Sequence, residues 1–159
     1  MFDRFGEFDS AQEMNEAAAA QLEEGDTEAV LAIAEENGID KEDAQDFIDG
    51  AVSELANPLM AAYGKLKIEE AELKPYEIMQ DWLSYIKVRC QEDEHMAAAV
   101  RKKGKSLKGC IGALLKWSFK NQHPVDKDII KAAGVNYHCT LGIPGMGRAK
   151  QIITEYYMG

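Results

Sequence analysis

The residues of this chain best suited to bind a ligand lie in a Gly-rich segment near its carboxyl end, at 141–150, which an apolar run follows at 152–157. Glycine permits a tight turn and lets a ligand approach the backbone closely. The first amides of the helix that follows favour phosphate. The other interpretation is a Gly-Pro turn that joins two packed helices. The candidate phosphate contacts here are Gly145, Gly147, Arg148 and Lys150.

A second group of cationic residues precedes this segment, at 101–108. Lysine and arginine beside a helix start can neutralise phosphates without reading base sequence. Trp117 and Phe119 follow, and aromatic rings stack on unpaired bases, although helical spacing favours a core position for Phe119. The other interpretation is a solvated basic connection between helices. The candidate phosphate contacts here are Arg101, Lys102, Lys103, Lys105 and Lys108.

Acidic residues dominate the rest of the chain, whose net charge is −10 at pH 7. Residues 1–99 carry 25 acidic and 7 basic side chains, whereas residues 100–159 carry 3 acidic and 11 basic ones. Such asymmetry favours nucleic-acid contact by the basic part or partner binding by the acidic part. Alternatively, the two parts neutralise each other across a shared interface.

The carboxylates of residues 7–54 are too numerous to serve as helix caps alone. A solvated face is the usual explanation for such a set. The sharper interpretation is an acidic surface that docks on a basic protein, because charge of this density steers association and makes it sensitive to salt. The candidate protein-binding residues are Glu35, Glu36, Asp40, Asp43 and Asp46.

Residue patterns typical of catalysis or of a bound metal are missing from the sequence. The carboxylates at 92–94 are consecutive and cannot share one helical face, and the three histidines lie far apart. No phosphate loop, nucleophile elbow or two-His helix motif is present. Cys90, Cys110 and Cys139 lack zinc-site spacing and close pairing, which indicates reduced thiols. We therefore expect no enzyme activity, no metal and no cofactor.

Capping signals divide the acidic part into short helices. Ser10 and Glu13 form a capping box, and Asp26 and Asp40 suit the N-cap position of two further helices. The apolar spacing predicts that the third helix runs on to residue 55, where Pro58 closes it. Residues 1–57 are thus predicted to be an acidic three-helix segment. Residues 59–74 give no clear element.

Further helices are predicted in the second half. Pro75 suits the first position of a long helix that a buried apolar stripe carries to about residue 100. Others are predicted after Ser106, after Asp126 and from about Gly147. Only residues 137–141 alternate as a strand would.

Together these elements predict an all-α fold, a compact helical bundle in which acidic N-terminal helices pack with a basic C-terminal helical region. The segments 1–57 and 75–159 are either separate units or one continuous domain. No stretch approaches the roughly 18 apolar residues of a membrane span, and the start of the chain lacks the pattern of a secretory signal. We expect a cytoplasmic protein without membrane contact, and the oligomeric state is left open.

Two parts of the sequence resemble known families. Tyr85, Arg89, Glu92 and Asp93, followed by Ala97, Lys105, Cys110, Ile111, Asp126, Asp128 and Ile129, resemble the PcfK-like proteins over residues 85–130. These are small proteins of conjugative plasmids and integrative elements in Gram-positive bacteria and Bacteroides. The family has no established biochemical activity, so the resemblance implies only an accessory protein of a bacterial mobile element. Residues 141–157 resemble the hairpin and second helix of the helix-hairpin-helix nucleic-acid-binding motif, although residues 134–140 separate this hairpin from the preceding helix.

Two hypotheses about function follow. In the first, a non-enzymatic accessory protein of a mobile element acts on nucleic acid or a nucleoprotein complex through its basic C-terminal region. In the second, the acidic helices form an inhibitor or adaptor that binds a basic nucleic-acid-handling machine, such as a host CRISPR-type defence nuclease. The first is favoured because two basic features fall in the same region. It requires the basic side chains to face outward.

Overall fold

The computed structural model describes residues 4–159, and its N-terminal helices begin where the capping signals predict. The Ser10 hydroxyl accepts a hydrogen bond from the Glu13 amide, and the Asp26 carboxylate accepts one from the Ala29 amide. Such bonds satisfy amides that have no partner inside the helix. The three helices form the N-terminal bundle: α1 (Ala11–Glu23), α2 (Thr27–Glu36) and α3 (Lys41–Ile48).

The third helix ends earlier than predicted. α3 stops at Ile48 because Gly50 adopts a left-handed φ of 79°, which ends the helix. Pro58 does not close this segment but starts α4 (Pro58–Leu73), where the Asn57 side chain accepts a hydrogen bond from the Met60 amide. Proline suits a first helical position because the amide it lacks would have no partner there.

Helix α4, which the sequence left unassigned, lies between two hydrophobic cores. Ala61 packs into the core of the N-terminal bundle, whereas Ala62 and Leu66 pack into a second core. Because α4 is covered from more than one side, its buried residues do not form the single apolar stripe of a surface helix.

The second core belongs to the C-terminal bundle of α5 (Ile78–Glu92), α6 (Glu94–Arg101), α7 (Leu107–Lys120) and α9 (Met146–Met158). The single helix predicted from Pro75 to residue 100 is wrong in two respects: α5 begins at Ile78, and the chain breaks at Asp93. Asp93 has extended φ and ψ angles, and its carboxylate accepts a hydrogen bond from the His95 amide, which starts α6.

The inner face of α7 is narrower than predicted. Leu107, Cys110 and Leu114 are fully buried, as the spacing predicts. The same spacing predicts that Leu115 and Phe119 also face the core, but they are 52% and 74% exposed. Phe119 is therefore a surface residue and not part of the core.

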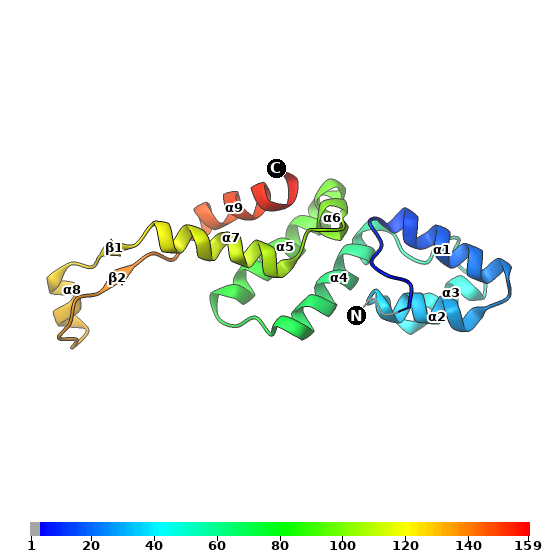
Figure 1. Cartoon of the computed structure of the whole chain (residues 1–159), viewed down its shortest axis with the longest axis horizontal. Coiled ribbons are helices and arrows are strands. Elements are labelled where there is room, and N and C mark those ends of the chain that lie inside the picture. Colours follow the sequence, from blue (N-terminus) through cyan, green and yellow to red (C-terminus); the bar gives the residue numbers. More distant parts are fainter. Residues whose placement is uncertain (1–3) are drawn as a thin grey trace.

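Between α7 and α9 the chain forms an arm, residues 121–145, that extends away from the C-terminal bundle (Figure 1). The arm contains β1 (His123–Pro124), α8 (Lys127–Ala132) and β2 (Thr140–Leu141). The strands pair antiparallel, with His123 opposite Leu141. A strand was expected at 137–141, and its last two residues form one.

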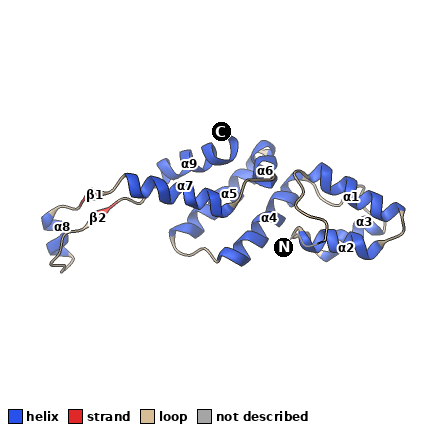
Figure 2. Cartoon of the chain, in the orientation of Figure 1, coloured by secondary structure: helices blue, strands red, loops and turns tan. Residues whose placement is uncertain are grey.

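The N-terminal bundle, the C-terminal bundle and the arm follow one another along the long axis of the molecule (Figure 1). The all-α prediction is confirmed, because helices dominate and the arm alone carries strands in the described part of the chain (Figure 2). Among residues 4–159, no helix is both long and apolar enough to cross a membrane.

Candidate functional site

Arg101, a predicted phosphate contact, is buried between the two bundles, so that prediction is wrong. Its side chain is 1% exposed; Nε donates to the carbonyl oxygen of Phe8 at 3.1 Å and Nη2 to Oδ1 of Asn37 at 2.8 Å. Burial lowers the pKa of Arg101, and the nearby carboxylates of Glu7 and Glu69 oppose that shift. The guanidinium ties the N-terminal bundle to α6. Arg101 falls four residues after the buried Ala97, a spacing that marks the inner face of α6.

A second buried cation, Lys65 of α4, holds the backbone of the basic run. Its Nζ lies 3.2 Å from a carboxylate oxygen of Glu7 and donates to the carbonyl oxygens of Lys102 at 2.9 Å and Lys105 at 2.6 Å. Burial lowers the pKa of Lys65, while Glu69 and Glu7 raise it. This role was not predicted, since no feature of the residues around Lys65 distinguishes it from an exposed lysine.

The other lysines of the run differ in exposure. Lys102, Lys103 and Lys108 are exposed. Lys105 is half-buried, because its Nζ donates to the Tyr156 carbonyl oxygen at 2.7 Å and lies 5.1 Å from the centre of the Tyr156 ring. Of the five predicted contacts in this run, three face solvent.

The Gly-rich segment enters α9 as extended chain. Gly145 is the N-cap, with φ −64° and ψ 166°, and neither Gly145 nor Gly147 adopts a left-handed φ. The predicted tight turn is therefore absent. A Cβ atom added at either glycine would meet nothing within 4 Å, so the backbone at the start of α9 is open to a ligand. The Ala149 amide donates to the Gly145 carbonyl, which leaves the first-turn amides of residues 146–148 facing outward.

The helix before this segment, α8, lies in the arm, and α9 packs instead on α5, α6 and α7. The Arg148 guanidinium lies 6.0 Å from the centre of the Trp117 ring of α7, and Lys150 Nζ lies 5.4 Å from the centre of the Tyr85 ring of α5. Cation–π contacts of this kind hold a charge at a surface without neutralising it.

The Arg148–Trp117 contact brings the start of α9 beside the second half of α7, where Lys116 and Lys120 are exposed. We call Lys116, Lys120, Arg148 and Lys150, with the aromatic rings of Trp117 and Phe119, the basic end. Lys116 and Lys120 belong to this site because the fold places α7 beside the start of α9. Their spacing in α7 alone did not single the lysines out.

The two predicted basic groups lie at opposite ends of α9. Lys105 contacts Tyr156 near the end of α9, whereas Arg148 lies at its start. Eight residues of helix separate them, about 12 Å at 1.5 Å per residue. The candidate contacts therefore divide into the exposed lysines 102, 103 and 108 and the basic end.

The predicted protein-binding carboxylates also differ in role. Glu36 accepts hydrogen bonds from the backbone amides of Arg4 and Phe5, at 2.8 and 3.2 Å, and so holds the start of the chain. Asp40 forms an exposed ion pair with Lys67 at 3.0 Å. Asp43 is half-buried, and Glu35 and Asp46 are exposed.

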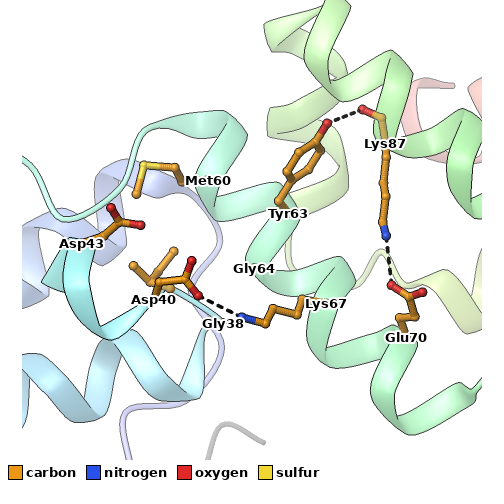
Figure 3. Close-up of a pocket in the computed structure, with 10 residues that line it drawn as sticks. Gly38, Asp40, Asp43, Met60, Tyr63, Gly64, Lys67, Glu70 and Lys87 are labelled. Atoms are coloured by element: carbon orange, nitrogen blue, oxygen red, sulfur yellow. Dashed lines mark hydrogen bonds and ion pairs between the residues drawn. The ribbon is translucent and has the colours of Figure 1, made fainter.

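Two hollows flank the Asp40–Lys67 ion pair, with volumes of about 410 and 700 Å³. Figure 3 shows the first hollow, where the Lys87 Nζ also pairs with Glu70 at 3.0 Å. Lys67 and Lys87, the two lysines that line it, each have a carboxylate partner. Within residues 4–159, no group of three or more His, Cys, Asp or Glu side chains is placed to hold a metal ion.

The three cysteines differ in environment, which predicts their reactivity. Cys90 and Cys110 are buried, and burial raises the pKa of each thiol to about 12, whereas Cys139 in the arm is half-exposed. Because the thiolate is the reactive form, we expect one thiol per folded chain to react with a thiol reagent at pH 8 and all three to react in denaturant. Two or more fast thiols in the folded protein would contradict the packing of the C-terminal core.

Comparison with known proteins finds no family model that matches this chain and no matching curated protein or solved structure. The PcfK-like resemblance of residues 85–130 therefore stays a prediction.

Proposed function

We propose that this protein binds nucleic acid without sequence preference, through the basic end. The observation that carries the proposal is the contact of Arg148 with Trp117. It brings the start of α9 together with exposed lysines of α7, and that start has no side-chain cap. Cationic side chains and free helix amides are the groups that bind phosphate.

The aromatic rings at this end suit single-stranded nucleic acid. Phe119 is 74% exposed beside Lys116 and Lys120, and Tyr137 in the arm is 73% exposed. Bases stack on such rings regardless of their identity, while lysines follow the backbone. The acidic N-terminal bundle repels nucleic acid and so confines binding to the opposite end.

In this proposal the protein is a non-enzymatic accessory factor of a bacterial mobile element that works in the cytoplasm. The context comes from the PcfK-like resemblance, and the nucleic-acid role comes from the basic end. Its targets are nucleic acid or a nucleoprotein complex.

Replacing Arg148 and Lys150 together by alanine is expected to weaken binding of a labelled single-stranded oligonucleotide about tenfold at low salt, equally for unrelated base sequences. Each lost phosphate contact also lowers the dependence of log Kd on log salt by about 1. Fluorescence anisotropy across a salt series measures both quantities.

The matched control replaces Lys102 and Lys103 by alanine, which removes the same charge from exposed positions elsewhere. At the point of the salt series at about 0.15 M it is expected to change affinity about threefold or less, because the Debye length there is about 8 Å and distant surface charges are largely screened. Equal losses in the two variants would show a diffuse charge effect and contradict a site at the basic end. Absence of binding by the wild-type protein at low salt would remove the proposal altogether.

The alternative function is that of an inhibitor or adaptor that binds a basic nucleic-acid-handling protein, such as a host CRISPR-type defence nuclease. One observation favours it: residues 1–57 carry 17 acidic and only 2 basic side chains, and Glu35 and Asp46 among them are exposed. A protein of this kind would associate with its target in a salt-sensitive manner and bind no oligonucleotide. The anisotropy experiment separates the two functions.

A further inference from the structure

The arm contains a hollow of its own, with a volume of about 540 Å³, which we call the arm pocket. It lies between the end of β1, α8 and the residues 134–138 that lead back toward β2. Its apolar side chains Val125, Ile130 and Val135 are half-buried. Ligand pockets in proteins typically have volumes of about 300–1,000 Å³ and an apolar lining with a few polar groups. The arm pocket therefore has the size and the apolar floor of a ligand site.

Backbone hydrogen bonds fix the shape of this pocket. The Val125 amide donates to the Cys139 carbonyl oxygen at 2.9 Å, which joins the two sides of the arm beyond the paired strands. The Val135 amide donates to the Ile130 carbonyl oxygen at 3.2 Å, and Gly134 ends α8 with a left-handed φ of 73°. The pocket is therefore formed before a ligand arrives, which lowers the cost of ordering on binding.

The charged lining of the pocket is positive, although the arm as a whole is neutral. Lys127 and Lys131 of α8 line it, and their spacing of four residues places them on one face of the helix. Within residues 4–159, neither lysine has an ion pair or a hydrogen bond, and no carboxylate lines the pocket. Asp126 caps α8 instead, where it accepts a hydrogen bond from the Asp128 amide. The two lysines are thus available to a phosphate group.

An exposed aromatic ring lies at the rim of the pocket. Tyr137 lines the pocket and is 73% exposed. Every base has a flat face that stacks on such a ring, so the contact tolerates any base sequence. Asn136, the next residue in the lining, has an amide that both donates and accepts hydrogen bonds and therefore suits the edge of any base. The pocket thus combines a ring for a base with cations for its phosphates.

We propose that the arm pocket takes one base of a bound single-stranded nucleic acid, stacked on Tyr137, while Lys127 and Lys131 contact the adjoining phosphates. The inference rests on the proposed function, since the same nucleic acid contacts the basic end. Lys120 of the basic end directly precedes the arm, and α9 with Arg148 follows it (Figure 1). The pocket therefore extends the binding surface from the basic end onto the arm.

The test compares two labelled single-stranded oligonucleotides of equal length and charge by fluorescence anisotropy, one with bases and one abasic. In the full-length protein, Tyr137→Ala is expected to weaken binding of the oligonucleotide with bases about tenfold, because it removes a stacking ring. It removes no charge, so binding of the abasic oligonucleotide is expected to stay unchanged. Tyr137→Phe keeps the ring and is expected to bind both as the wild type does. The matched control is Tyr76→Ala, which removes a tyrosine that is 66% exposed between α4 and α5 and is expected to change neither affinity.

The lysines of the pocket give a second readout. Lys127→Ala with Lys131→Ala is expected to weaken binding of both oligonucleotides about tenfold at low salt, because the phosphates are common to the two. Circular dichroism establishes that each variant folds.

The outcomes separate this inference from the proposed function. If Tyr137→Ala binds both oligonucleotides as the wild type does, or weakens both equally, stacking in the arm pocket is overturned, and the Arg148 and Lys150 variant still decides on the basic end. Sensitivity to Tyr137 without sensitivity to Arg148 and Lys150 would support the pocket and move the binding site from the basic end to the arm. A mononucleotide that displaces the oligonucleotide at equal concentration would assign the pocket to free nucleotides and overturn its role in holding a nucleic acid.

Discussion

Replacing Arg101 by methionine is expected to lower the free energy of unfolding by about 2–4 kcal/mol. The methionine fills much of the same space but cannot donate to the Phe8 carbonyl or to Asn37 Oδ1, which both accept from Arg101 in the folded protein. A buried acceptor that loses its donor costs about 1–3 kcal/mol. Urea unfolding followed by circular dichroism measures the change. Arg101→Lys is expected to recover only part of this loss in stability. The lysine keeps the positive charge, but its ammonium group lacks the fork of donors that reaches both acceptors.

The matched control is Lys102→Met, which removes one positive charge from the neighbouring, exposed position. Surface substitutions of this kind change stability by at most about 0.5 kcal/mol. Equal and small effects of the two methionines would place Arg101 at the surface and restore it as a candidate phosphate contact. Nucleic-acid affinity gives a second readout, since Arg101→Met is expected to leave it unchanged while the variant remains folded.

Helix starts were predictable because capping is local chemistry. Ser10, Asp26, Ser106 and Asp126 each accept a backbone amide hydrogen bond in the structure, as their positions in the sequence indicate. An N-cap needs only a short polar side chain and the two or three residues that follow it. Such local signals therefore predict a helix start independently of how the rest of the chain folds.

Burial by distant parts of the chain was not predictable. α4 showed no apolar stripe because two bundles cover it, and its Lys65 is held by Glu7 from one side and by the end of α6 from another. No residue near Lys65 in the sequence indicates either of these partners. Phe119 is the opposite case, an aromatic residue at helical spacing that the fold leaves on the surface.

The sequence predicted what kind of site this is, but not all of the residues that form it. Opposite charge at the two ends of the chain follows from composition, and most of the lysines of the basic part do face solvent. Arg101 differs from these lysines: although it is charged, it lies on the inner face of α6 and is buried. Lys116 and Lys120 joined Arg148 only because α7 and α9 run side by side, an arrangement that depends on the C-terminal core.

Replacing Gly64 by alanine is expected to destabilise the fold by about 2–3 kcal/mol, against the usual gain when alanine replaces a helical glycine. A Cβ atom at Gly64 would overlap the Asn37 carbonyl oxygen, so α4 and the turn after α2 would have to separate. That turn also contains Gly38, whose own missing Cβ permits the same close contact. Urea unfolding measures the change.

Gly112→Ala is the matched control for this close contact. Gly112 also lies inside a helix, but a Cβ atom there would meet nothing within 4 Å, so alanine is expected to stabilise the protein by up to about 1 kcal/mol. If Gly→Ala lowers the free energy of unfolding at Gly64 and raises it at Gly112, the difference reports the close backbone contact at Gly64. An increase in stability at both positions would contradict that contact. Because the Asn37 that Gly64 touches also binds Arg101, the double variant Gly64→Ala with Arg101→Met is expected to lose less than the sum of the single losses.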